Sequence, residues 1–374
     1  LPTGLQSNYE WVQLENDPHP RVIRNFNTMG QSWQARYTLP SAEQTASNPA
    51  LGKTEVVDHL GRKQTWYWNE RYQICSWEDA QGHSWKMQWN AEGLLNHCEQ
   101  PNGGVWKFEY DPNGNLCKQI NPLGHIEQTL WRQDLPLPLK ETDAQGHITE
   151  YEYDHKGNLQ TEITPAGSTC YVLDQYGQVT RIKDAQGLEK QLMWRSDGQL
   201  ALYIDCSNRI TRFEYDAFGN LRQQTDALGH ANCYEYNALG QLIAHHSPDG
   251  ASQHWAWQAG KLKAWQNPKK HITSWQYTAA GQLALQEQSL QAGIMPDGQA
   301  STISTHYQWD SAGNLSQLLD PNNAITHFKY DAADRLIAQI GSDDLRTEYT
   351  LDSLGKPVKV VQAAGTPQAI TLHL

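Results

Sequence analysis

The chain has 374 residues, a formal net charge of −12 and a hydrophobic content of 38%. An excess of acidic residues excludes nucleic acid as the main partner, because binding to phosphates requires clustered Lys and Arg. The sequence has no run of 18 apolar residues, which a membrane-spanning helix would need. Its 15 Trp and 17 Tyr carry large apolar bodies with polar groups, so we expect an ordered chain rather than a disordered one.

Residues 1–53 have little periodicity and predict an irregular lead-in or cap. One hairpin is expected around Asn27–Gly30, and the stretch from Pro40 to Gly52 reads as a loop. Terminal units of repeat arrays are usually atypical, which fits this position in the chain. Because the sequence starts at Leu1 rather than at Met, we also expect a fragment or a processed piece.

Residues 54–355 carry a repeat of about 21 residues. Its clearest copies share the pattern Tyr-Asp-x-x-Gly-Asn-Leu and start at Tyr110, Tyr153 and Tyr215. A second series, Asp-x-x-Gly, runs half a period away. A turn signal therefore arrives every ten or eleven residues along most of this region, which predicts a tandem array of two-stranded β-hairpins.

The residues of each turn signal have a defined chemical role. Asp at the first turn position accepts backbone hydrogen bonds, and Gly three residues later takes the left-handed conformation of a type I turn with a bulge. The predicted structural turn residues are Asp111, Gly114, Asp154, Gly157, Asp216 and Gly219 in the first series, and Asp143, Gly146, Asp226 and Gly229 in the second.

About six residues separate successive turns, which is the length of one strand. Aromatic and charged residues alternate in these segments, as in Arg212-Phe213-Glu214-Tyr215, so aromatic side chains gather on one face of the sheet. The residues predicted for this aromatic sheet face are Tyr110, Tyr153, Tyr215, Tyr236, Tyr277 and Tyr330.

The predicted fold class is therefore all-β, with the hairpin repeats forming one large curled antiparallel sheet. About two dozen strands are expected, and open sheets of more than about ten strands must coil or close. The period breaks at an insertion at about residues 286–302 and at the prolines of residues 131–139. Residues 356–374 read as a C-terminal tail or a truncated repeat.

The recurring Tyr-Asp-x-x-Gly-Asn-Leu pattern over about residues 55–355 resembles the RHS/YD-repeat family. The resemblance implies repeats that form part of a hollow, barrel-like cocoon. Bacterial members are polymorphic toxins, including type VI secretion effectors and insecticidal toxin-complex subunits, whose shell encloses a toxic C-terminal domain. Many of them end the shell in a self-cleaving segment, and no matching motif is found here.

The candidate sites favour structural roles. Each turn offers one carboxylate, whereas Ca²⁺ takes six to eight oxygen ligands, so turn capping is preferred over metal binding. Histidines that follow a turn Gly, such as His83 and His147, recur with the repeat and are read as strand-edge residues. No HExxH, GxSxG or Walker-type motif occurs, so we expect no catalytic residue, no metal and no cofactor.

The preferred hypothesis is a non-catalytic wall segment of an RHS-repeat shell that encapsulates a toxic domain or other cargo for delivery. The expected partners are the rest of the shell, the enclosed toxin domain, and secretion-spike or chaperone proteins. The expected location is the bacterial cytoplasm before export, then the medium or the target cell. The alternative is an extracellular adhesion or carbohydrate-binding array, since stacked Trp and Tyr also bind sugars.

Overall fold

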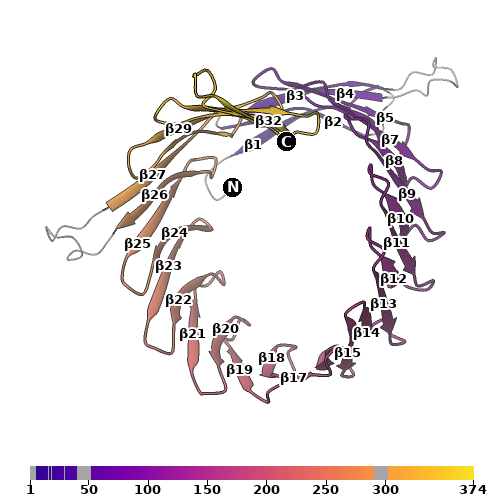
Figure 1. Ribbon diagram of the computed structural model, residues 1–374, viewed down its shortest axis with the longest axis vertical. Helices are drawn as coiled ribbons and strands as arrows, with labels where there is room; N and C mark the ends of the chain where they lie inside the picture. Colours follow the sequence, from indigo (N-terminus) through magenta and orange to yellow (C-terminus); the bar gives the residue numbers. More distant parts are fainter. Residues whose placement is uncertain (1–5, 16, 18, 29, 40–51, 290–301) are drawn as a thin grey trace. The chain divides into compact units, whose positions relative to one another are not determined.

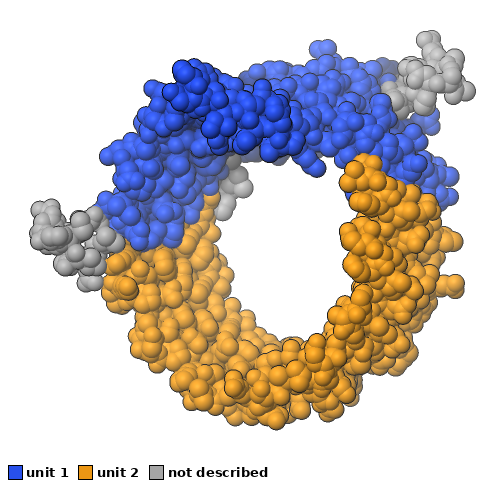
Figure 2. Space-filling model, in the orientation of Figure 1, with its two compact units in different colours: residues 1–107, 273–374 blue, residues 108–272 orange. Residues whose placement is uncertain are grey.

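The computed structural model describes residues 6–15, 17, 19–28, 30–39, 52–289 and 302–374. These residues form 33 β-strands, and they contain no helix that could cross a membrane. The chain divides into two compact units (Figure 2). Unit 1 consists of residues 1–107 and 273–374, and unit 2 consists of residues 108–272. Two predictions lie outside the described residues, namely most of the loop at 40–52 and most of the insertion at 286–302.

The strands of unit 1 come from both ends of the sequence. Its first segment holds β1 (Ser7–Val12), β2 (Arg21–Asn27), β3 (Ser32–Thr38), β4 (Gly52–Asp58), β5 (Lys63–Trp68), β6 (Ile74–Glu78), β7 (Ser84–Trp89) and β8 (Leu95–Glu99). Its second segment holds β26 (Leu283–Ser289), β27 (Thr302–Trp309), β28 (Leu315–Leu319), β29 (Ile325–Tyr330), β30 (Leu336–Ile340), β31 (Arg346–Leu351), β32 (Pro357–Gln362) and β33 (Ile370–His373). The strands β9 (Val105–Tyr110) and β25 (Ile272–Tyr277) contain the unit boundaries.

Unit 2 is a run of hairpins in chain order, and Figure 1 shows its strands following one another along a curve. Such curvature is expected, because each strand is twisted and a long open sheet does not stay flat. The strands are β10 (Leu116–Ile120), β11 (Ile126–Trp131), β12 (Pro138–Thr142), β13 (Ile148–Tyr153), β14 (Leu159–Thr164), β15 (Gly167–Leu173), β16 (Val179–Lys183), β17 (Glu189–Trp194), β18 (Leu200–Ile204), β19 (Ile210–Tyr215), β20 (Leu221–Thr225), β21 (Ala231–Tyr236), β22 (Leu242–His246), β23 (Ser252–Gln258) and β24 (Lys261–Gln266).

From β10 to β24, each strand pairs antiparallel with the next in sequence. In β19 and β20, for example, Arg212 lies opposite Thr225 and Glu214 opposite Gln223, and a bulge follows before Tyr215 meets Leu221. The same bulge recurs where other hairpins enter the Tyr-Asp turn, as between β13 and β14. The prediction of an all-β array of antiparallel hairpins that curls is thus confirmed.

The structure has more strands than the two dozen expected. Several turns close without glycine, because Asn208, Lys270, Asn323 and Asp344 adopt positive φ angles of 58° to 67°. The segment expected to be an irregular lead-in also pairs β1 with β2, in addition to the β2–β3 hairpin around Asn27–Gly30. After residue 356, β32 and β33 pair as well, where a tail or truncated repeat was expected.

The sheet has almost no buried core. Among the described residues, the buried apolar side chains are Trp68, Ala244 and Ala338, and the most buried of these three residues, Ala338, is 2% exposed. Most strand residues are half-buried, because neighbouring side chains on the same face cover one another. The stability of a single-layer sheet therefore depends on its hydrogen bonds and turns more than on a packed interior.

The turn at Gly219 offers a direct test of this dependence. Gly219 has a φ of 87°, and a Cβ added there would lie 3.0 Å from Nε2 of Gln199. We expect Gly219→Val to destabilise the protein by about 1–2 kcal/mol or more, because a β-branched residue is strained in this conformation. Thermal unfolding measures the effect. The neighbouring Phe218→Ser, at an 89% exposed position, should change stability by less than about 0.5 kcal/mol. Equal stability of Gly219→Val and the native protein would contradict the role of this turn.

Candidate functional site

The turns form the two edges of the array. Successive turns of an antiparallel meander alternate between its two edges. The Tyr-Asp-x-x-Gly turns therefore share one edge, which we call the YD edge. The structure places Asp111, Gly114, Asp154, Gly157, Asp216 and Gly219 in turns of this edge. The opposite edge, here the Asp-x-x-Gly edge, contains Asp143, Gly146, Asp226 and Gly229.

One carboxylate organises each Tyr-Asp turn. Oδ1 of Asp216 accepts hydrogen bonds from the backbone N–H groups of Phe218 and Asn220, each at 2.9 Å, and Oδ2 accepts one from Nδ2 of Asn220 at 2.9 Å. Asp111 and Asp154 repeat this arrangement. The Asn side-chain amide, followed by backbone donors, lowers the pKa of all three carboxyl groups. Asn in the Gly-Asn-Leu motif thus completes the cap.

Histidine replaces this asparagine on the Asp-x-x-Gly edge. Nδ1 of His147 lies 2.9 Å from Oδ2 of Asp143, and Nδ1 of His230 lies 3.0 Å from Oδ2 of Asp226. The carboxylates of Asp143 and Asp226 also accept backbone hydrogen bonds within the same turns. These histidines therefore bind their own turns, and the described residues contain no group of three or more metal-ligating side chains.

The aromatic residue that ends every second strand makes a contact that the sequence analysis missed. Oη of Tyr215 donates to the carbonyl of Leu200, 15 residues earlier, at 2.9 Å. Oη of Tyr153 donates to the carbonyl of Pro138 at 2.8 Å. Trp residues at the same strand position donate through Nε1 at 2.7 to 2.9 Å, namely Trp89, Trp131, Trp194, Trp257 and Trp309.

A signal for this contact is present in the sequence. The strand-end position holds Tyr or Trp in most repeats and Leu at 173 and 351, but never Phe. Phe occurs two residues earlier instead, at Phe108, Phe213 and Phe328, where no polar atom is needed. The other residues predicted for the aromatic face, Tyr110, Tyr236, Tyr277 and Tyr330, end their strands in the same way and are half-buried. Burial raises the pKa of Tyr110, Tyr236 and Tyr330.

Neighbouring turns of the YD edge are also joined directly. Nε2 of Gln73 donates to the carbonyl of Gly93 at 2.9 Å, and Nε2 of Gln199 donates to that of Gly219 at 2.8 Å. Gln282 makes the same bond to Gly313 at 2.9 Å. Each bond connects one turn of the YD edge to the next, so these turns are not independent loops.

The strand-end hydroxyl groups should contribute measurably to stability. We expect Tyr215→Phe to lower the free energy of unfolding by about 1 kcal/mol, because the carbonyl of Leu200 loses its donor while the ring is retained. Chemical denaturation measures the change. Tyr234→Phe is the matched control, because the Tyr234 ring stacks on His245 with centroids 4.9 Å apart and its hydroxyl has no partner among the described residues. Similar losses in both variants would show that the hydroxyl contact is not the cause.

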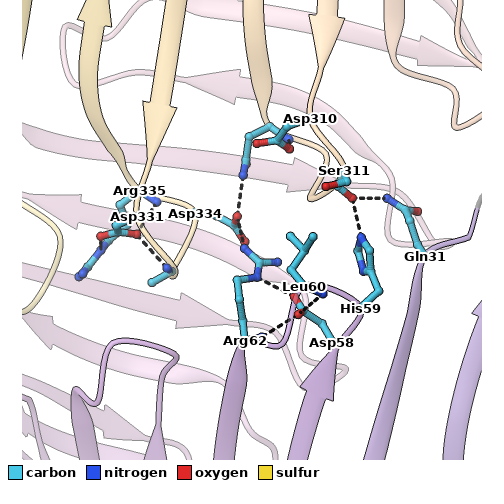
Figure 3. A network of polar contacts seen from close by, with 12 residues as sticks. Gln31, Asp58, His59, Leu60, Arg62, Asp310, Ser311, Asp331, Asp334 and Arg335 are labelled. Atoms are coloured by element: carbon cyan, nitrogen blue, oxygen red, sulfur yellow. Dashed lines mark hydrogen bonds and ion pairs between the residues drawn. The ribbon is translucent and has the colours of Figure 1, made fainter.

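Two segments of unit 1 that are distant in sequence meet at a group of polar contacts, which we call the clasp (Figure 3). The clasp consists of Gln31, His59, Arg62, Ser311 and Asp334. The carbonyl of Ser311 accepts from Nε2 of Gln31 at 3.3 Å and lies 2.9 Å from Nε2 of His59. Arg62 forms an ion pair with Asp334 and a second one, at 2.6 Å, with Asp58.

The clasp joins opposite kinds of edge. The turn at residues 58–61 belongs to the Asp-x-x-Gly edge, whereas the turns at residues 310–313 and 331–334 belong to the YD edge. Asp334 stands where most Tyr-Asp turns have Gly, and it has a φ of 60°. Its carboxylate also accepts from Nδ2 of Asn314 at 2.6 Å. Burial raises the pKa of Asp58, but hydrogen bonds from Arg62 outweigh that effect, so this pKa is lowered.

Replacing Asp334 distinguishes its role in the turn from its role in the clasp. Asp334→Gly gives the turn its preferred residue but removes the acceptor of Arg62, so we expect a net change in global stability of at most about 1 kcal/mol. Amide hydrogen exchange at residues 58–62 should nevertheless become several-fold faster. Asp344→Gly is the control, because Asp344 has a φ of 58° and lies outside the clasp. Unchanged exchange in Asp334→Gly would contradict a role for this ion pair in holding the two segments together.

The fold and the edges define a tandem β-hairpin repeat protein, and comparison with known proteins identifies the repeat. Residues 137–169, 196–231 and 330–367 match the RHS repeat model. Double-stranded DNA deaminase toxin A of Burkholderia cenocepacia strain H111 is 31% identical over 136 residues, which are 36% of this chain and 9% of that protein. Three segments of the chain thus carry the RHS repeat that the sequence motif predicted.

Solved structures support the same fold. The crystal structures of TcdB2-TccC3-Cdc42 and TcdB2-TccC3 each match all of this chain with a TM-score of 0.78, at 16% and 17% identity. The matched region is 22% of the first chain and 23% of the second. At this level of identity the likeness concerns the fold. The chain thus spans about a tenth to a quarter of the length of the proteins that it matches.

Proposed function

We propose that this chain is a wall segment of an RHS-repeat shell that encapsulates a toxic domain or other cargo for delivery to target cells. The observation that carries the proposal is a single-layer sheet with the fold of part of TcdB2-TccC3 over its full length. A sheet of this kind separates two spaces without enclosing a core of its own. Its function is therefore that of a barrier, and the mechanism is steric.

The two edges support further wall segments as partners. In unit 2, apolar side chains at turn tips are strongly exposed, namely Tyr176, Phe218 and Leu239 on the YD edge and Leu123 and Leu228 on the opposite edge. The clasp in unit 1 already shows one YD edge docking onto an Asp-x-x-Gly edge. We propose that the exposed tips take part in similar edge contacts with the remainder of the shell, and that a toxin domain lies within it.

The wall itself is proposed to be non-catalytic. The acidic groups that the repeat places regularly, the turn aspartates, are already engaged by backbone and side-chain donors of their own turns. We further propose synthesis in a bacterial cytoplasm followed by secretion or delivery, with secretion-spike or chaperone proteins as partners. Similarity to a toxin supports the delivery step.

Electron microscopy of the natural full-length polypeptide tests encapsulation. We expect a hollow β-walled particle with density inside, and protection of the enclosed segment from added protease. Arg62→Ala combined with Asp334→Gly, which removes the ion pair of the clasp, should increase protease cleavage of the cargo. A solid rod or an open sheet without enclosed density would overturn the proposal.

A further inference from the structure

A groove of about 350 Å³ opens beside the clasp in unit 1. Trp33 of β3 and Trp66 of β5 line it, together with Val56 of β4. Its polar lining comes from Asp58, Arg62 and Gln64. The volume is within the range of small-molecule sites, which combine mostly apolar walls with a few polar groups.

Strand register explains the shape of this groove. Trp33 lies opposite Asp58, Ala35 and Gln64 lie opposite Val56, and Trp66 lies opposite Thr54. Residues directly opposite each other in a ladder share one face of the sheet. The two indoles therefore stand at diagonal corners, and the small side chains of Ala35 and Val56 leave the space between them open.

These two indoles differ from the tryptophans that end the strands. The strand-end residues, such as Trp131 and Trp194, donate their N–H groups to carbonyls and support the fold. The indole N–H groups of Trp33 and Trp66 form no hydrogen bond with any described residue. On the same face, Trp66 lies opposite Trp77, whose ring is stacked on Trp85 with centroids 4.2 Å apart.

The charges around the groove restrict the ligand. Arg62 lies between the carboxylates of Asp58 and Asp334, so an anionic ligand would meet two like charges and a cationic ligand would meet the guanidinium. Figure 3 shows these three side chains together. A neutral ligand with hydroxyl groups can donate to carboxylates, and it can accept from Arg62 and from the amide of Gln64. Its apolar C–H face can pack against an indole ring.

We propose that the groove between Trp33 and Trp66 binds a pyranose ring of a neutral oligosaccharide. This site does not depend on encapsulation. A wall segment with such a site would also attach to a glycan-bearing surface. The binding function and the barrier function can therefore be tested separately.

Nuclear magnetic resonance of the indole N–H groups tests the site in the ¹⁵N-tryptophan-labelled chain. Maltohexaose, cellohexaose and chitohexaose are titrated in turn, and we expect at least one to shift the Trp33 and Trp66 signals in a saturable manner. Trp33→Ala should weaken binding by about tenfold or more, and Gln64→Ala should weaken it several-fold. Trp275→Phe, which alters an indole outside the groove, should leave the affinity unchanged.

A second variant guards against loss of folding. Val56→Leu keeps both indoles but fills the space between them, so it should abolish the shifts while the far-ultraviolet circular dichroism stays native. Nα-acetyl-lysine amide and p-cresol serve as a cationic and an aromatic probe. The proposal is overturned if none of the three saccharides shifts the two signals, or if either of these probes binds more tightly than every saccharide.

Discussion

The hydrogen-bonded turn is the interaction on which the rest of this structure depends. A single-layer sheet with three buried apolar side chains among its described residues cannot rely on a hydrophobic core. Each strand pair must instead be fixed in register at its turn, because a slip of one residue would move the aromatic side chains to the other face. The carboxylates of Asp111, Asp154 and Asp216 hold that register with three hydrogen bonds each.

The repeat extends this local order across the sheet. A strand-end Tyr or Trp binds a carbonyl of the preceding hairpin, and Gln73 or Gln199 binds the next turn of the YD edge. The first contact spans 15 residues and the second spans 20, so each of them ties a hairpin to its neighbour in the array. Contacts of this kind account for an ordered array in which no hairpin could bury its own surface, as in other repeat proteins.

The local parts of this design were predictable from the sequence. The spacing of Asp and Gly located the turns, and the alternation of residues such as Phe213 and Glu214 showed two unlike faces. Turns closed by Lys270 or Asp344 were harder to recognise, because their positive φ angles are unusual for these residues. The clasp was beyond local reasoning, since 272 residues separate Arg62 from Asp334 and no periodic signal connects them.

The aspartates of the turns contribute much of the negative charge of the chain, and this charge explains why the clasp contains an arginine. Aspartates recur at the first turn position on both edges, as at Asp143 and Asp216, so much of the net charge of −12 comes from capping. Two such edges repel each other when they meet, because each presents carboxylates. Arg62 lies between Asp58 and Asp334 and bonds to both, which converts a repulsive contact into an attractive one. Contact between two acidic edges therefore requires donors that offset the carboxylates, as Arg62 does for Asp58 and Asp334.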